Sequence, residues 1–175
     1  MKSTIDDIIS RRSIRKFKDE QISDTELKSI LRAGTYAPTG AGRQSPKIIV
    51  IQDENKIKEF SKWNAEYFPN VPDGFDPFYS AKTLLIVLAD SEIPTYVEDG
   101  SSVLSVLVNA AHALGVGSCW IHRARDEFAS DKGKELLKEW NIPETFEGIG
   151  HVVLGYPDEE PIAAPRKEDY IYYVD

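Results

Sequence analysis

The strongest strand pattern in the sequence is TLLIVL, at Thr83–Leu88. Three other stretches also predict strands, at Lys47–Ile51, Ser118–Ile121 and Gly148–Gly155. The first of these three is a short run of β-branched residues, which favours a buried strand. Helical apolar spacing occupies the intervals, so strand and helix patterns alternate along the chain.

Helical spacing occurs in several segments. One of them opens on Ser23-Asp24-Thr25-Glu26, a capping box in which the Ser and Glu side chains satisfy backbone N–H groups of the first turn. Residues Pro69–Pro77 contain three prolines and a glycine, which predicts a loop. The predicted helices are Thr4–Arg12, with Ile5, Ile8 and Ile9 on one face, the capped helix ending near Gly34, a helix carrying Ile57, Phe60 and Trp63, Val97–Leu114, and Lys132–Trp140.

The helix predicted at Val97–Leu114 is the longest, and its apolar residues extend almost all round from Val103 onward. Such a helix is buried, either in the centre of a domain or at a subunit interface. The segment Tyr170–Val174 is strand-like but follows a proline-rich arm, Pro157–Pro165, so we expect it to pair outside its own core. No repeat or Ser/Gly linker divides the sequence, which predicts one domain over residues 1–175.

Charge and composition exclude several classes of protein. Lys and Arg total 21 against 29 Asp and Glu, and a net charge of −8 disfavours nucleic acid and anionic membranes as partners. The single cysteine, Cys119, excludes an intrachain disulfide, a Cys-based zinc site and an iron–sulfur cluster. Met1–Asp7 lacks the apolar core of a secretory signal, and no apolar run approaches the roughly 18 residues of a membrane span. We therefore expect a cytoplasmic protein.

A basic cluster stands out against this acidic background, because five of the 21 basic residues fall within Arg11–Lys18. A cationic helix C-terminus is one interpretation. The other is an anion site, because the planar forks of arginine suit phosphate and Ser13, between Arg11 and Arg15, adds a hydroxyl donor. One phosphate joined to an electron-rich ring would use this set well.

Other candidate sites are weaker. Gly40–Gly42 precedes a strand and Gly115–Gly117 ends a helix, whereas a dinucleotide fingerprint follows a strand and opens a helix, so both predict turns. His112, His122 and His151 have no spacing typical of a metal site, and the first and last are expected to be structural. No nucleophile elbow is present, so no side chain is expected to act as a covalent catalyst.

Four motifs together resemble the FMN-dependent nitroreductase family, in that family's order and over essentially the whole chain. They are RRSIRKF at Arg11–Phe17, YAPTG with QSP at Tyr36–Pro46, AAHALGVGSCWI at Ala110–Ile121, and GYP at Gly155–Pro157 with the arm Pro165-Arg166-Lys167. The resemblance implies an α+β fold, with a central, mainly antiparallel sheet flanked by helices. It also implies an obligate homodimer with two FMN molecules at its interface and exchanged C-terminal arms, which would cover an exposed sheet edge.

The resemblance further implies roles for individual residues. Arg11 and Ser13 would hold the FMN phosphate and ribityl chain, and Arg166 would close on the phosphate from the arm. Arg12 would contribute mainly through backbone and ribityl contacts. Arg15 would lie at the pyrimidine edge, where a cation stabilises the negative charge of reduced flavin.

Two further segments complete the implied site. Pro38, Thr39 and Gly40 would approach the flavin from the partner subunit. The residues that would line its other face, with a backbone N–H directed at N5, are Trp120, Ile121, His122 and Arg123. This sequence departs from the family pattern at Gly42, where many relatives have asparagine, and at His122-Arg123, which replaces a common acidic or Gly-containing pair. It also lacks a helical insertion of longer members, so its substrate pocket should be differently bounded.

We therefore expect an FMN-dependent oxidoreductase. NADH or NADPH would pass a hydride to FMN, and a small planar electron acceptor (a nitroaromatic, a quinone or a free flavin) would then take its place. The alternative is a flavin-binding storage or sensor protein with little turnover, and NAD(P)H oxidation with defined acceptors separates the two. Specialised flavin chemistry and an anion-binding module without flavin are further alternatives.

Overall fold

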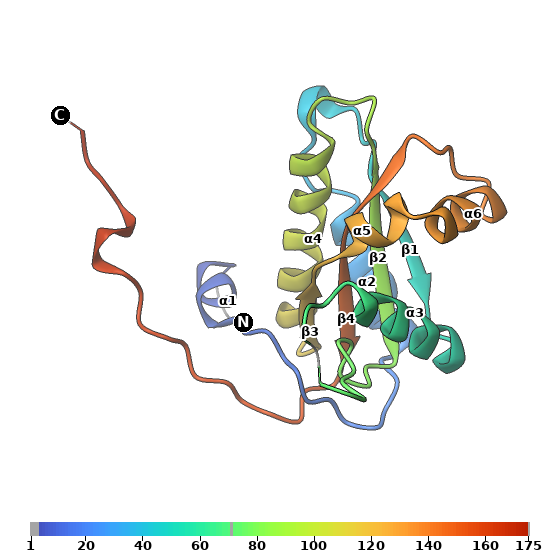
Figure 1. Ribbon diagram of the computed structural model, residues 1–175. Coiled ribbons are helices and arrows are strands. Elements are labelled where there is room, and N and C mark those ends of the chain that lie inside the picture. The colour runs from blue at the N-terminus through green and yellow to red at the C-terminus, as the bar shows by residue number, and fades with distance from the viewer. Residues whose placement is uncertain (1–3, 71, 175) are drawn as a thin grey trace.

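A computed structural model describes residues 4–70 and 72–174 of the chain (Figure 1). Its sheet has four strands in the order β1-β2-β4-β3, and every neighbouring pair is antiparallel. The strands are β1 (Lys47–Ile51), β2 (Thr83–Asp90), β3 (Gly117–Ile121) and β4 (Phe146–Gly155). The predicted α+β class and the central antiparallel sheet are confirmed.

Strand β2, which contains the TLLIVL stretch, lies inside the sheet and is buried on both faces. Leu84, Ile86 and Leu88 belong to one hydrophobic cluster, whereas Leu85 and Val87 belong to the other. Because successive strand residues point to opposite faces, a continuous apolar run supplies both clusters at once.

Helices cover both faces of this sheet (Figure 1). Helices α2 (Asp24–Gly34) and α4 (Tyr96–Ala113) supply one cluster, and α3 (Glu54–Glu66), α5 (Ala124–Ala129) and α6 (Asp131–Glu139) supply the other. The four helices predicted in these regions are present, and most of their ends lie within one or two residues of the predicted ends. Helix α5 was not predicted because its six residues are too few to show a helical period.

The long helix α4 packs against the sheet along one side. Its buried residues include Leu104, Leu107 and Ala111, whereas Val97 and Leu114 at its two ends remain exposed. The helix therefore lies in the domain core, as one of the two predicted alternatives required, and still leaves apolar surface at its ends.

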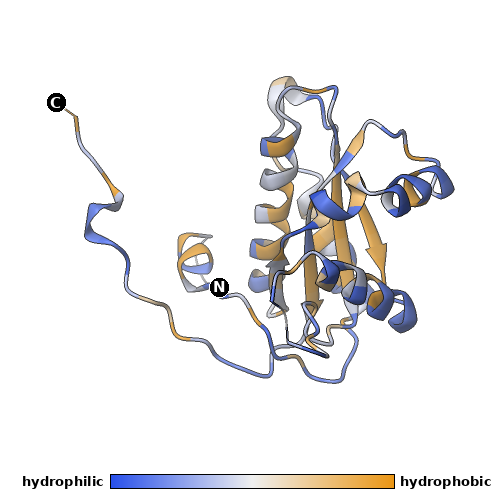
Figure 2. Cartoon of the chain, in the orientation of Figure 1, coloured by the Kyte–Doolittle hydropathy of each residue, from blue (hydrophilic) through white to orange (hydrophobic). Residues whose placement is uncertain are grey.

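The C-terminal arm runs away from this body, whereas helix α1 lies beside it and contacts α4 through Ser10 and His112 (Figures 1 and 2). Helix α1 (Thr4–Ser10) ends earlier than predicted, and Ile5, Ile8 and Ile9 on it are exposed rather than buried. From Ile162 the C-terminal arm is exposed, with one short turn, η2 (Glu168–Tyr170). Within the described residues the strand-like segment Tyr170–Val174 pairs with no other segment.

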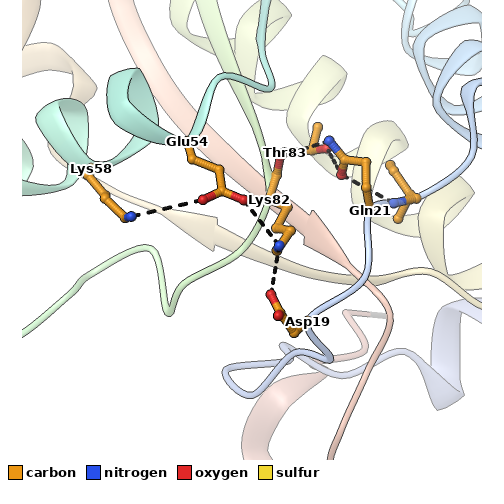
Figure 3. Close-up of polar contacts among 7 residues, drawn as sticks. Asp19, Gln21, Glu54, Lys58, Lys82 and Thr83 are labelled. Carbon is orange, nitrogen blue, oxygen red and sulfur yellow. Dashed lines mark hydrogen bonds and ion pairs between the residues drawn. The ribbon is translucent and has the colours of Figure 1, made fainter.

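The segment that follows the basic cluster is tied to the sheet by polar contacts (Figure 3). Lys82 Nζ lies 2.6 Å from Asp19 Oδ1 and 3.1 Å from Glu54 Oε1. Next to it, the Thr83 hydroxyl donates to Gln21 Oε1 over 3.0 Å. These contacts attach residues 19–21 to the start of β2 and the first turn of α3, and so anchor the C-terminal end of the basic segment.

The glycine pairs form turns, as predicted. Gly40–Gly42 is a 3-10 turn, η1, and Gly115 takes a left-handed φ of 77° directly after α4. His112 lies on α4 and His151 in β4. In the part of the chain that the structure describes, no His, Cys, Asp and Glu side chains gather into a group of three that could hold a metal ion. No helix of that part is both long and apolar enough to cross a bilayer.

Candidate functional site

The basic segment runs as an extended chain along the outer edge of β3. The Ile14 N–H donates to the Ser118 carbonyl over 2.9 Å, and Ser13 forms an isolated parallel bridge with Ser118. Alternate side chains of an extended chain face opposite sides. The three residues that share one side are Arg11, Ser13 and Arg15.

The buried thiol of Cys119 lies beside this row. Burial raises the pKa of the Cys119 thiol, whereas the charges of Arg15 and Arg11 and a hydrogen bond with Ser13 oppose that rise. Neither arginine forms a salt bridge within residues 4–70 and 72–174. The row thus presents two guanidinium groups and a hydroxyl, a donor set that suits a phosphate, with the Glu159 carboxylate nearby at the Arg15 main chain.

The Arg12 side chain faces the opposite side of the extended segment and forms hydrogen bonds with main-chain carbonyls. Its Nη1 donates to the carbonyls of Ile9, over 2.8 Å, and Arg11, over 2.6 Å, at the C-terminal end of α1. With His112 it lines a cavity of about 360 Å³ on the α4 side of the segment. The Nη1 of Arg12 is therefore engaged at the end of α1, whereas its buried Nε has no hydrogen-bond partner within the described residues.

The row has a direction. Because Ser13 is paired with Ser118 in parallel, Arg15 is carried toward Trp120 and Arg11 toward the start of β3. Beyond Trp120, β3 ends at Ile121 and the chain turns through His122 and Arg123 into α5. A ligand lying along the row would thus have one end at Arg11 and the other at this turn.

The turn itself presents mixed chemistry. Trp120 is 41% exposed although it belongs to a strand, and Ile121 beside it is buried. The indole packs over Gly150 of β4: a Cβ there would lie 2.7 Å from the Trp120 Nε1, so the close approach requires glycine. The half-exposed indole therefore lies on the α4 face of the sheet, near Leu104, whereas the Cys119 thiol beside the basic row belongs to the cluster on the opposite face.

Arg123 takes a left-handed φ of 81°, which non-glycine residues rarely adopt. The fully buried Asn64 of α3 donates from Nδ2 to the His122 carbonyl over 3.0 Å. Its Oδ1 accepts from Arg123 Nε and Nη2, over 3.0 Å and 2.9 Å. Burial lowers the pKa of the Arg123 guanidinium. Asn64 was missed in the sequence, although a signal existed: it lies seven residues after Ile57 on the buried face of α3, where an apolar residue is expected.

A buried pair supports the turn from behind. His151 Nε2 lies 2.5 Å from Glu127 Oε2, and neither side chain is exposed to solvent. The Glu127 N–H donates to the Arg123 carbonyl over 3.1 Å, so this pair connects β4 to the first turn of α5. His151 has the structural surroundings that were expected of it, and Glu127 was not anticipated.

Pro38, Thr39 and Gly40 lie at the opposite end of α4 from the basic row. The Gly40 N–H donates to Asp99 Oδ1 over 2.8 Å near the start of that helix, whereas the hydroxyl of Ser10 contacts His112 Nε2 over 2.9 Å near its end. The rise of an α-helix puts about 20 Å between these two positions. One chain therefore does not bring the two sets of residues together.

The arm begins beside the basic segment and then leaves it. The N–H of Asp158 donates to the Lys16 carbonyl over 2.9 Å, and the N–H of Arg15 donates to Glu159 Oε1 over 2.5 Å. Farther along, Arg166 is exposed and its guanidinium donates to the Ala164 carbonyl. Figure 1 shows this C-terminal arm running away from the sheet and the helices that cover it.

Known proteins resemble this chain in sequence and in fold. A sequence profile of the nitroreductase family matches residues 8–156. A protein of Archaeoglobus fulgidus, provisionally named an NADH dehydrogenase/NAD(P)H nitroreductase, is 32% identical over 160 residues, which cover 87% of this chain and 84% of that protein. An NADPH-flavin oxidoreductase of Vibrio harveyi is 27% identical over 180 residues, covering 95% of this chain and 70% of that protein.

A solved structure extends the likeness to three dimensions. The nitroreductase of Bacteroides fragilis, determined with bound FMN, superimposes with a TM-score of 0.86 at 25% identity, over 100% of both chains. The profile, the archaeal relative and this superposition agree over nearly the whole length of the sequence. The chain therefore belongs to the nitroreductase family.

Proposed function

We propose that the protein is an FMN-dependent oxidoreductase that uses NADH or NADPH to reduce a small planar acceptor. The observation that carries this proposal is the row of Arg11, Ser13 and Arg15, which forms no salt bridge within the described residues and runs alongside β3 toward the turn at His122 and Arg123. The FMN-bound nitroreductase and the flavin oxidoreductase among its relatives support the same chemistry.

The residues present fit FMN better than a larger dinucleotide. Arg11 and Ser13 would hold the single phosphate, and Arg15 would lie nearer the ring. The glycine fingerprint that usually receives a dinucleotide is absent from the sequence. When bound, FMN would supply the two-electron chemistry, accepting hydride from the nicotinamide and passing it to the acceptor.

The chain's own groups would bind, orient and provide charge. A guanidinium at Arg15 would stabilise negative charge that develops on the pyrimidine edge of the ring. The main chain from Trp120 to Arg123 would offer an N–H toward N5. The indole of Trp120, which is exposed, would favour flat acceptors such as nitroaromatics, quinones and free flavins by stacking.

A homodimer would complete this site. Pro38–Gly40 lies about 20 Å along α4 from the basic row and Arg166 leaves on the arm, so both sets would reach a flavin only from a second subunit. The sheet supports such an exchange. The outer edge of β3 is occupied by Ser13 and Ile14, whereas β1 is the other edge strand and no ladder covers its outer side in the described residues. The arm segment Tyr170–Val174 would pair with that edge of its partner.

The test is a titration followed by a turnover assay. We expect the purified protein to be yellow or to take up FMN, to bind FAD more weakly, and to oxidise NADH or NADPH when a nitroaromatic or quinone is added. Tighter binding of FAD than of FMN would contradict the cofactor assignment. Tight FMN binding without turnover with any of these acceptors would instead favour a storage or sensor protein.

A further inference from the structure

The turn between β3 and α5 holds a backbone conformation that its sequence does not favour. Arg123 has a φ of 81°, and the left-handed region is unfavourable for a non-glycine residue because its Cβ is crowded by the backbone. Helix α5 starts directly after it without a side-chain cap. Neither local propensity nor capping accounts for this turn, so other contacts must stabilise it.

A single buried side chain supplies those contacts. Asn64 has no exposed surface, and both ends of its amide are used on two consecutive residues of the turn. Its Nδ2 holds the His122 carbonyl, and its Oδ1 accepts two hydrogen bonds from the Arg123 guanidinium. Breaking either contact would leave a buried polar group without a partner.

The guanidinium is held on its other side as well. Its Cζ lies 4.6 Å from the centre of the Phe68 ring, a cation–π distance. The Arg123 guanidinium thus donates two hydrogen bonds to a buried side chain of the protein itself, Asn64. The Arg123 side chain therefore forms contacts inside the protein, with Asn64 and Phe68, rather than being free to bind a phosphate.

We propose that Asn64 and Arg123 are positioning residues: together they hold the His122–Arg123 peptide in its left-handed turn and so direct the main-chain N–H groups after Trp120. This inference rests on the proposed function, in which that turn lines the flavin. Asn64 acts through Arg123 and His122 and touches no cofactor. The Arg123 side chain, by its hydrogen bonds with Asn64, holds its own main chain in the left-handed conformation.

The first test is a double-mutant cycle read by FMN binding. Asn64→Ala is expected to weaken FMN binding by about tenfold, because the turn loses the contacts that stabilise it. Arg123→Gly removes the strain, since glycine adopts positive φ freely. In the Arg123→Gly background we therefore expect Asn64→Ala to change the FMN dissociation constant by less than about threefold. Equal effects of Asn64→Ala in both backgrounds would overturn the proposal.

The second test reverses the usual expectation for a conservative change. Arg123→Lys keeps the positive charge and the strained φ but loses the fork that holds Asn64. We expect Arg123→Lys to weaken FMN binding more than Arg123→Gly does. If the charge acted on the cofactor directly, the order would be the opposite, and the proposal would fail. This comparison remains decisive even if Asn64→Ala does not fold.

A spectroscopic readout separates positioning from loss of stability. The visible circular dichroism of bound FMN, at saturation, should change in Asn64→Ala because the ring is held differently. The matched control is Ser61→Ala, which removes a buried polar group of the same helix, a hydroxyl that donates to Asp76 rather than to the turn. It should lower thermal stability and leave the flavin signal unchanged. An unchanged signal in Asn64→Ala would overturn the proposal, whereas a wild-type protein that binds no FMN would overturn the proposed function and this inference with it.

Discussion

At the scale of single residues, Arg11 and Arg15 lie in one row but should differ in effect. Arg11 is at the end proposed for the phosphate, so Arg11→Ala should weaken FMN binding by about 1.5–3 kcal/mol, the value of a hydrogen bond to a charged group. Arg15→Ala should lower the reduction potential of bound FMN, because the reduced ring loses its counter-charge. For a two-electron couple about 30 mV corresponds to 1.4 kcal/mol, so the shift is measurable.

The measurement that decides between the two arginines is a potential titration of each variant saturated with FMN. Saturation removes the loss of affinity that Arg15→Ala also causes. An unchanged potential in Arg15→Ala together with a shifted potential in Arg11→Ala would mean that the flavin lies in the reverse direction along β3.

Gly150 allows a second test at this scale. A Cβ at position 150 would meet Trp120 Nε1 at 2.7 Å and Leu104 Cδ1 at 2.9 Å. Gly150→Ala should therefore lower the free energy of unfolding by about 1–3 kcal/mol and shift the tryptophan fluorescence. Gly42→Ala is the control, because no atom lies within 4 Å of a Cβ there and only its φ of 66° is unfavourable. A Gly150→Ala protein with wild-type stability and fluorescence would show that the indole does not pack over this strand.

At the scale of elements, the start of α2 should make stability depend on pH. Glu26 accepts hydrogen bonds from the Ser23 side chain, from the Tyr156 hydroxyl over 2.7 Å and from the Ser23 N–H, and these lower its pKa below the ordinary 4.5. Because the folded-state pKa is the lower one, the carboxylate stabilises the fold above about pH 4.5 and loses that effect as the pH falls through the lowered value.

Glu26→Gln should accordingly unfold more readily than the wild type at pH 7, and the difference should shrink toward pH 3. Denaturant unfolding across this range measures it. Tyr156→Phe is the matched control, because it removes one of the hydrogen bonds and should reduce the pH dependence without abolishing it. A constant difference between Glu26→Gln and the wild type at every pH would contradict the assignment.

At the scale of the whole molecule, the arm should control both assembly and cofactor binding. Truncation after Pro161 removes Arg166 and the strand-like Tyr170–Val174, so we expect a monomer that binds FMN about tenfold more weakly or worse. Sedimentation and an FMN titration measure the two effects. In the intact protein, unfolding should depend on protein concentration, because folding and association are linked.

The full-length variant Arg166→Ala separates the two contributions of the arm. It should weaken FMN binding and leave the dimer intact, because the pairing segment is retained. A truncated protein that still sediments as a dimer and binds FMN like the wild type would exclude an exchanged arm.

Much of this protein is determined by local sequence. The run at Thr83–Leu88 has to be a buried strand because nothing polar interrupts it, and Ser23 with Glu26 specifies a helix start by chemistry confined to four residues. Arg11, Ser13 and Arg15 were grouped as an anion site from the sequence, but their alternation along an extended chain was not predicted, because the helix expected at Thr4–Arg12 included Arg11. Helix α5 was not predicted, because a segment of six residues is too short to show a helical period of apolar residues.

Tertiary structure alone decided the rest. The orientation of the basic row depends on the pairing of Ser13 with Ser118, and the support of Arg123 depends on Asn64, 59 residues earlier in the sequence. Both are contacts between distant segments, set by how α3 and the N-terminal chain pack on one sheet. Local patterns state which side chains an element turns inward or outward. They do not determine which inward-facing side chains contact each other, because those contacts depend on the register and packing of elements that are far apart in the chain.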